Sequence, residues 1–221
     1  MCLICRGKLL EGLEYLRVCR NVTTLPELPQ SLIQLDCINC PLLTTFPKLP
    51  QSLKYLWCFN CPLLTTLPEL PQSLIGLSCS VCPLLNTIPE LPQSLTYLDC
   101  LKCPSIQYLP RLPQSLKYLN CSNCHLLTTF PELPQSLKQL NCSKCVNLIF
   151  IPENAKKHIS SEMLETINSN YLKWRKEQTL NWFSSTHGIV YEDLIRKTWH
   201  PDRVVDWCWD TEEVKWFKTL R

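Results

Sequence analysis

The stretch Leu49-Pro-Gln-Ser-Leu53-Lys-Tyr-Leu56-Trp-Cys58-Phe-Asn-Cys61 decides the fold, because versions of it recur along most of the chain. The tag Leu-Pro-Gln-Ser-Leu begins at residues 28, 49, 70, 91, 112 and 133, and every interval is 21 residues. Self-similarity at a fixed short period is typical of repeat proteins, in which each unit stacks on the next. The six full units therefore predict a solenoid, preceded by degenerate N-terminal coils.

Alternation within each unit predicts a short strand. In Leu35-Asp36-Cys37, Leu35 and Cys37 are expected to point inward and Asp36 outward. The expected inward residues of this coil are Leu32, Leu35, Cys37, Cys40, Leu43, Phe46 and Leu49. Because seven apolar residues cannot stabilise one coil alone, stability must come from neighbouring coils that share a parallel ladder. The prolines of the unit cannot donate to a ladder, and they are expected on an extended, polyproline-like convex side.

The cysteines raise a second possibility, because Cys37, Cys40, Cys58 and Cys61 have the spacing of a four-thiolate zinc site. Stacked coils lie ~4.8 Å apart, so equivalent cysteines should form two columns along the solenoid. Tetrahedral zinc would pair the coils two by two, and the repeats show no such alternation. We therefore favour columns of buried thiols over zinc or inter-coil disulfides, since cysteine behaves as a small, readily buried hydrophobe. No metal, cofactor or catalytic residue is expected.

Composition and charge exclude several classes of partner. The chain has 221 residues, a net charge of +3 and 45% hydrophobic residues, which indicates a globular protein without a basic surface. Nucleic acid is therefore not expected as a partner, and no apolar run is long enough to cross a membrane. The start of the chain does not read as a signal peptide, so reduced thiols and a cytoplasmic location are expected.

The unit contains L-x-x-L-x-C-x-x-C, as in Leu53-Lys-Tyr-Leu56-Trp-Cys58-Phe-Asn-Cys61. This resembles the core of the leucine-rich repeat, L-x-x-L-x-L-x-x-N/C-x-L, with cysteine in place of one leucine. An earlier coil, residues 13–21, carries the same core with Val18 and Asn21 where later coils have cysteines. The flanking Leu-Pro-x-Leu-Pro segments look closest to the short repeats of secreted bacterial effectors. The resemblance implies an α/β solenoid, a horseshoe whose parallel ladder lines the concave face.

Composition changes near residue 152. Seventeen of the 18 prolines and 15 of the 16 cysteines lie at or before Pro152, whereas six of the seven tryptophans follow it. The sequence thus predicts a solenoid over residues 1–152 and a helical, tryptophan-rich cap over residues 153–221. A first helix is expected from Ser160 to about Phe183, with further helices after Gly188.

Two tail motifs resemble functional motifs of known families. Cys208-Trp-Asp210 is similar to the nucleophile motif of bacterial ubiquitin ligases, and His200-Pro-Asp202 is similar to the loop of J-domain co-chaperones. The chain around each motif is too short for either domain, so the protein is predicted not to be an enzyme. The segment Trp199–Glu213 looks like a tail found in proteins of giant DNA viruses of amoebae, which would place the protein in the host cytoplasm or the virion.

These patterns predict a scaffold that binds a partner protein, of the host if the chain is viral, through its concave face. Outward strand positions are mostly polar, but one coil carries three aromatic residues. The predicted protein-binding residues are Tyr55, Trp57, Phe59, Ile38, Tyr97, Leu101 and Tyr118. The rival hypothesis is an adaptor that recruits substrates to ubiquitin ligation or to a chaperone through the C-terminal helices. A free edge in residues 1–20 also predicts a homodimer.

Overall fold

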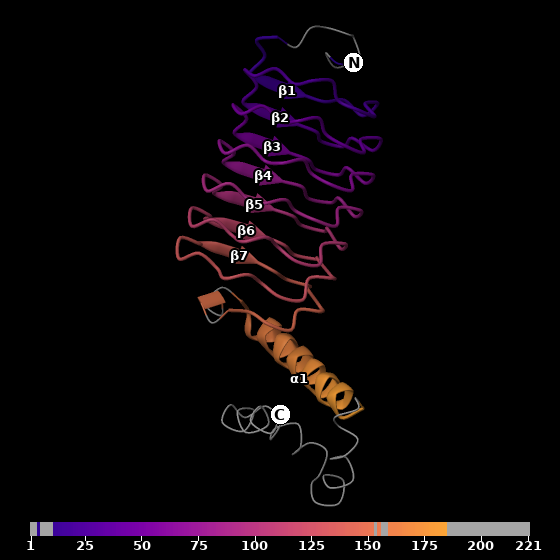
Figure 1. The fold of residues 1–221 in the computed structure, drawn as a ribbon, viewed down its shortest axis with the longest axis vertical. Coiled ribbons are helices and arrows are strands. Elements are labelled where there is room, and N and C mark those ends of the chain that lie inside the picture. The colour runs from indigo at the N-terminus through magenta and orange to yellow at the C-terminus, as the bar shows by residue number, and fades with distance from the viewer. Residues whose placement is uncertain (1–3, 5–10, 153, 156–158, 185–221) are drawn as a thin grey trace, which may run out of the picture. The chain divides into compact units, whose positions relative to one another are not determined.

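The computed structural model describes residues 4, 11–152, 154–155 and 159–184, and it contains one parallel sheet and one helix. The chain divides into two compact units, residues 1–167 and residues 168–221. Seven strands of three residues each stack in sequence order, as Figure 1 shows. They are β1 (Tyr15–Arg17), β2 (Gln34–Asp36), β3 (Tyr55–Trp57), β4 (Gly76–Ser78), β5 (Tyr97–Asp99), β6 (Tyr118–Asn120) and β7 (Gln139–Asn141). The predicted solenoid with a parallel ladder is confirmed. The predicted division at residue 152 stays a prediction.

All neighbouring strands pair in the same register, so equivalent residues of successive coils lie side by side. Leu35 of β2 is opposite Leu56 of β3, which is opposite Leu77 of β4. The ladder continues past each strand: the Cys58 amide donates to the Ser78 carbonyl at 2.7 Å, and the Asn60 amide donates to the Ser80 carbonyl at 2.9 Å. A strict 21-residue period therefore becomes a set of straight rows that run the length of the sheet.

The interior consists of leucine and cysteine. The central leucine of every strand is buried, and the two predicted cysteine columns are buried as well. The columns are Cys37, Cys58, Cys79, Cys100, Cys121 and Cys142, and Cys40, Cys61, Cys82, Cys103, Cys124 and Cys145. All of these thiols are free. Phe46, which was expected inside with them, is only partly buried.

Thiols of the second cysteine column also donate hydrogen bonds to the backbone of the preceding coil. The Cys61 thiol donates to the Cys37 carbonyl at 3.0 Å, and the Cys103 thiol donates to the Cys79 carbonyl at 3.0 Å. The same bond recurs from Cys82, Cys124 and Cys145 to the carbonyl of the first cysteine of the preceding coil. Each thiol thus donates a hydrogen bond to a carbonyl of the buried interior, where polar groups need partners.

Burial also controls the charge state of the thiols. Loss of solvation raises the pKa of Cys37 and Cys58 well above the usual thiol value, and it raises the pKa of Cys142 to about 12. Loss of solvation likewise raises the pKa of Cys121. Because a charged thiolate is costly in an apolar interior, these groups stay protonated at neutral pH.

The serine of each tag joins its coil to the one before. Ser52 donates its hydroxyl hydrogen to the Leu32 carbonyl at 2.7 Å, and Ser115 donates to the Leu95 carbonyl at 2.6 Å. The tag itself is a turn, in which the Leu53 amide donates to the Pro50 carbonyl at 3.1 Å. These two bonds explain why Pro-Gln-Ser-Leu repeats so strictly.

A second turn separates the two cysteines of each coil, and one of its residues has positive φ. These residues are Asn39, Asn60, Val81, Lys102, Asn123 and Lys144. Asparagine tolerates the left-handed conformation well, whereas a β-branched side chain does not. Val81, with φ of 59°, is therefore a strained position in an otherwise regular solenoid.

The C-terminal end of the solenoid is followed by α1 (Ser161–Ser184), whose bounds lie within one residue of the predicted helix. The Ser160 hydroxyl accepts a hydrogen bond from the Met163 amide at 3.3 Å, as an N-cap does. Ile167 is buried in the core, and Met163 and Leu164 pack against it. The first two turns of α1 therefore belong to the first compact unit. The further helices predicted after Gly188 lie outside the described residues.

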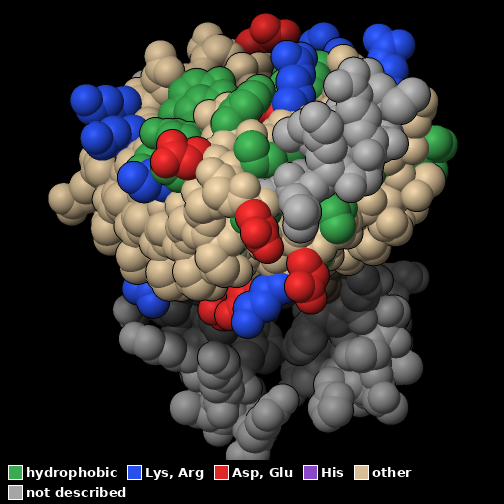
Figure 2. Space-filling model, turned by 90° about the horizontal axis from the view of Figure 1, so that it is seen from above, with side chains coloured by type: hydrophobic (Ala, Val, Ile, Leu, Met, Phe, Trp, Pro, Cys, Tyr) green, Lys and Arg blue, Asp and Glu red, His purple; other side chains and the backbone are tan. Residues whose placement is uncertain are grey.

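The opposite end of the sheet is β1, which pairs with β2 alone within the described residues. Seen from that end, hydrophobic side chains lie together between Lys or Arg and Asp or Glu side chains (Figure 2). Most of residues 1–10, on which the predicted homodimer partly depends, lie outside the description, and the dimer stays a prediction. No helix among the described residues is long and apolar enough to span a membrane.

Candidate interaction surface

The solvent-facing side of the seven strands, here called the sheet face, carries two rows of side chains. The first row is Tyr15, Gln34, Tyr55, Gly76, Tyr97, Tyr118 and Gln139. The second, here called the central row, is Arg17, Asp36, Trp57, Ser78, Asp99, Asn120 and Asn141. The strand register places both rows, because outward residues of a strand are two positions apart.

Four rings meet on the sheet face and form what we call the aromatic platform: Tyr55, Trp57, Tyr97 and Tyr118. Tyr55 stacks on Trp57 with ring centroids 5.9 Å apart, and Trp57 meets Tyr97 edge-on at 5.7 Å. Tyr97 stacks on Tyr118 at 4.5 Å with an interplanar angle of 2°. All four side chains remain partly exposed. The platform is therefore a connected aromatic surface that spans β3 to β6.

The platform is continuous because β4 has no side chain at Gly76. An added Cβ there would lie 2.8 Å from Cη2 of Trp57 and 3.1 Å from Cδ1 of Tyr55. Such a contact is too short, so the indole lies in space that any other residue would fill. Ser78, the next outward residue of β4, is also small and is buried. The ring of Trp57 can thus cross β4 and reach Tyr97 on β5.

Burial and acidic neighbours keep the tyrosine hydroxyls protonated. Desolvation, together with the nearby Asp99, raises the pKa of Tyr97 to about 12. Tyr15 donates its hydroxyl hydrogen to Oδ2 of Asp36 at 2.7 Å, and this bond raises the pKa of Tyr15. Tyr15 and Tyr97 therefore act as neutral hydrogen-bond donors over the physiological pH range.

Three side chains of the central row, on β5, β6 and β7, cap the turn that follows their strand. Oδ1 of Asp99 accepts from the Leu101 amide at 3.1 Å, and Oδ1 of Asn120 accepts from the Ser122 amide at the same distance. Asn141 and Ser143 repeat this arrangement in the next coil. Bonds of this kind between a side chain and the backbone two residues on are common in turns. Asp36 and Asn120, expected to be solvated, are nearly buried, because neighbouring side chains cover them.

The structure brings four of the seven predicted binding residues into the aromatic platform. Phe59, which follows β3, is exposed to 42%, and Ile38 and Leu101 are half-buried beyond β2 and β5. Ring contacts reach none of these three within the described residues. Sequence reasoning missed Gly76, although it is the sole glycine in a row of tyrosine and glutamine and could have signalled a gap.

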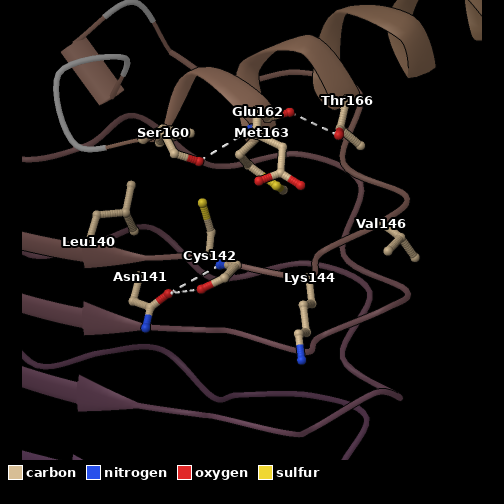
Figure 3. Close-up of a pocket in the computed structure, with 11 residues that line it drawn as sticks. Leu140, Asn141, Cys142, Lys144, Val146, Ser160, Glu162, Met163 and Thr166 are labelled. Atoms are coloured by element: carbon tan, nitrogen blue, oxygen red, sulfur yellow. Dashed lines mark hydrogen bonds between the residues drawn. The ribbon is translucent and has the colours of Figure 1, made fainter.

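A hollow lies at the end of the solenoid, between the last coil and the start of α1 (Figure 3). Its volume is ≈ 550 Å³, and Cys142 and Met163 extend into it from opposite sides. Lys144 lies on the coil side with its amino group directed away from the helix. The lining mixes apolar side chains such as Leu140 and Val146 with polar ones such as Ser143 and Glu162.

Other predicted chemistry falls outside the described residues. This applies to Cys208 and Asp210 of the ligase-like motif, to His200-Pro-Asp202, and to the tail that looks viral. Within the described residues, no three His, Cys, Asp or Glu side chains are grouped so that they could hold a metal ion.

Comparison with known proteins assigns the coils to a class. The family model described as Leucine Rich Repeat matches residues 52–74 and 115–137. The matched segments are two coils of the solenoid, and the other coils follow in the same register. The coils of the solenoid are therefore of the leucine-rich-repeat type.

One solved structure similar to the chain is YopM from Yersinia enterocolitica WA-314. The identity is 32%, the match covers 59% of this chain and 32% of that one, and the TM-score is 0.45. The match thus spans about a third of the length of that protein. No curated protein matches the sequence.

Proposed function

We propose that the protein is a non-enzymatic scaffold that binds a partner protein through the sheet face, with the aromatic platform at the centre of the interface. The sheet face is the concave side of the horseshoe expected from the repeats. The observation that supports the proposal most directly is the platform itself: four partly exposed rings held in contact across four strands.

Physical chemistry favours this surface as an interface. Tyrosine and tryptophan are the residues that most often dominate binding energy, because each buries a large area at little conformational cost. The rings are fixed before binding by their mutual contacts and by the rigid ladder beneath them. Preorganisation of this kind reduces the entropy that association must overcome.

The test compares partner capture by three forms of the full chain: wild type, Trp57→Ala and Tyr108→Ala. Tyr108 is an exposed aromatic residue outside the strands, so it serves as a matched control. A partner captured by wild type and by Tyr108→Ala should be lost or weakened with Trp57→Ala, by ~2 kcal/mol in a direct binding measurement, as for a hot-spot residue. Equal binding by all three forms would place the interface elsewhere.

The fold of each variant is checked by circular dichroism and thermal unfolding. Trp57 lies outside the leucine and cysteine core, so Trp57→Ala should retain the spectrum of the wild type. Collapse of the solenoid in this variant would show that the ring stabilises the coil rather than binding a partner.

A further inference from the structure

The central row places acidic groups on both sides of Trp57. Asp36 of β2 is the direct neighbour of Trp57 in the ladder, and Asp99 of β5 lies two strands beyond it, after Ser78. Asp99 also shares β5 with Tyr97, two residues away on the same face. Trp57 therefore lies between two carboxylates of the central row, one on β2 and one on β5.

Neither carboxylate has a cationic partner in the described part of the chain. Asp36 accepts hydrogen bonds from the Tyr15 hydroxyl at 2.7 Å and from Nε2 of Gln34 at 2.9 Å. Asp99 accepts from the Leu101 amide. Arg17 is opposite Asp36 in the ladder and is exposed, yet these bonds join Asp36 to Tyr15 and Gln34 instead. Both carboxylates are thus oriented by neutral donors of the described chain.

Two kinds of group on this surface attract a cation. The face of an aromatic ring carries negative potential, most strongly in tryptophan, and a partly desolvated cation gains most from it. A fixed carboxylate beside the ring adds Coulomb attraction that is stronger near a protein surface than in bulk water. A planar guanidinium can use both at once, because it stacks on a ring and donates to carboxylate oxygens in the ring plane.

We propose that the aromatic platform, flanked by Asp36 and Asp99, binds an arginine side chain of a segment of the partner protein. The inference rests on the proposed function, because it names the chemistry that the partner presents to the same surface. Charge complementarity carries it: the half-buried Asp99 lies beside Tyr97, the buried Asp36 adds negative charge next to Trp57, and neither carboxylate forms an ion pair among the described residues.

The structure offers variants that remove the charge and keep the fold. Asn120 and Asn141 occupy the same row as Asp99, and their Oδ1 atoms make the same bond to the amide two residues on. Asp99→Asn therefore retains a side-chain oxygen where the Leu101 amide needs an acceptor. Asp36→Asn likewise keeps an oxygen for Tyr15 or Gln34. Glu90→Gln removes an exposed charge outside the strands and is the matched control.

The experiment titrates the full chain, labelled with fluorotryptophan, with an acetylated, amidated pentapeptide that contains two arginines. The second probe is the same peptide with citrulline, which has nearly the same shape and no charge. Fluorine NMR follows the resonance of Trp57, which is identified by its loss in Trp57→Phe. We expect the arginine peptide to shift this resonance in a saturable manner, and the citrulline peptide to bind at least about fivefold more weakly.

Asp99→Asn and Asp36→Asn should each weaken the arginine peptide about threefold or more, whereas Glu90→Gln should not change its affinity. Equal binding of the arginine and citrulline peptides would overturn the inference, and so would the absence of any shift of the Trp57 resonance. These failures differ from failure of the proposed function. The latter is judged by partner capture with Trp57→Ala, and it would stand if the platform bound a neutral apolar segment.

Discussion

The coil that contains β3 and the coil that contains β4 have the same interior and opposite surfaces. Leu56 and Cys58 of the first correspond to Leu77 and Cys79 of the second, and all four are completely buried. On the sheet face, Tyr55 and Trp57 of β3 stand beside Gly76 and Ser78 of β4. The large side chains of one coil occupy the space that the small side chains of the next leave open. The core thus follows the repeat, whereas the site arises where neighbouring coils depart from it together.

Alkaline pH should lower the free energy of unfolding, because it ionises the cysteines that both coils bury. This is the largest effect that we expect. Burial raises the pKa of the Cys37, Cys58, Cys121 and Cys142 thiols in the folded state, to about 12 for Cys142. The unfolded chain ionises near the ordinary thiol value, about 8.5. Stability is therefore fully present below that pH and decreases as pH rises toward the folded values, by about 1.4 kcal/mol per pH unit for each such thiol.

Urea unfolding of the reduced protein at a series of pH values checks this. The midpoint should be constant at neutral pH and fall above the ordinary thiol pKa, with the four buried thiols of raised pKa contributing together. A midpoint that stayed level well into the alkaline range would mean that the thiols ionise in the folded state.

Truncation of the central leucine should show that the two interiors are equivalent. Leu56→Ala and Leu77→Ala each remove a fully buried side chain from a close-packed strand. Each should lower the free energy of unfolding by ~2–5 kcal/mol, and by similar amounts. Chemical denaturation followed by circular dichroism measures both. A large difference between the two variants would show that the surfaces, and not the interiors alone, control the stability of these coils.

Exchange of the positive-φ turn residues, Asn60 in the first coil and Val81 in the second, tests whether the two coils differ in backbone strain. Val81→Asn places a tolerant residue at a φ of 59° and should stabilise the protein by ~1 kcal/mol. The reciprocal change, Asn60→Val, should destabilise by at least as much, since it also removes the hydrogen bond from Asn60 to Asn39. Thermal unfolding of both variants tests the opposite signs. Changes of the same sign would refute the strain argument.

A side chain at Gly76 should have the smallest effect on stability and a clear effect on the aromatic platform. The Cβ of Gly76→Ala would displace the far end of the Trp57 side chain, so the free energy of unfolding should change by less than ~1 kcal/mol. Contact between Trp57 and Tyr97 should be lost, and partner binding should weaken. The control is Gln139→Ala, an exposed change in the same row. Unaltered binding by Gly76→Ala would show that the continuity of the platform does not matter.

The fold could be read from the sequence because its determinants repeat. A strict period places Leu35, Leu56 and Leu77 in one buried row, and the helix start at Ser160 has an ordinary capping residue. The thiol-to-carbonyl bonds could not be predicted, since they depend on the distance between a side chain and the backbone of another coil.

The site could be predicted only in part, for a related reason. Aromatic residues that depart from a polar column are visible in a sequence, and Tyr55 and Trp57 were found in this way. The direction of the Trp57 side chain depends on the small residues of the next coil, Gly76 and Ser78. That is why the importance of Gly76, and the burial of Asp36 beneath its neighbours, emerged only in three dimensions.

The serine bonds give the solenoid a mechanical property. Each one joins a coil to the coil before it, as Ser73 does to Leu53 and Ser94 to Leu74, so a pulling force is transmitted through successive junctions of nearly identical design. Under tension along the axis, coils should detach one after another from an end, and each release would lengthen the chain by one repeat, roughly 70 Å. The molecule would then extend under force in steps of equal length.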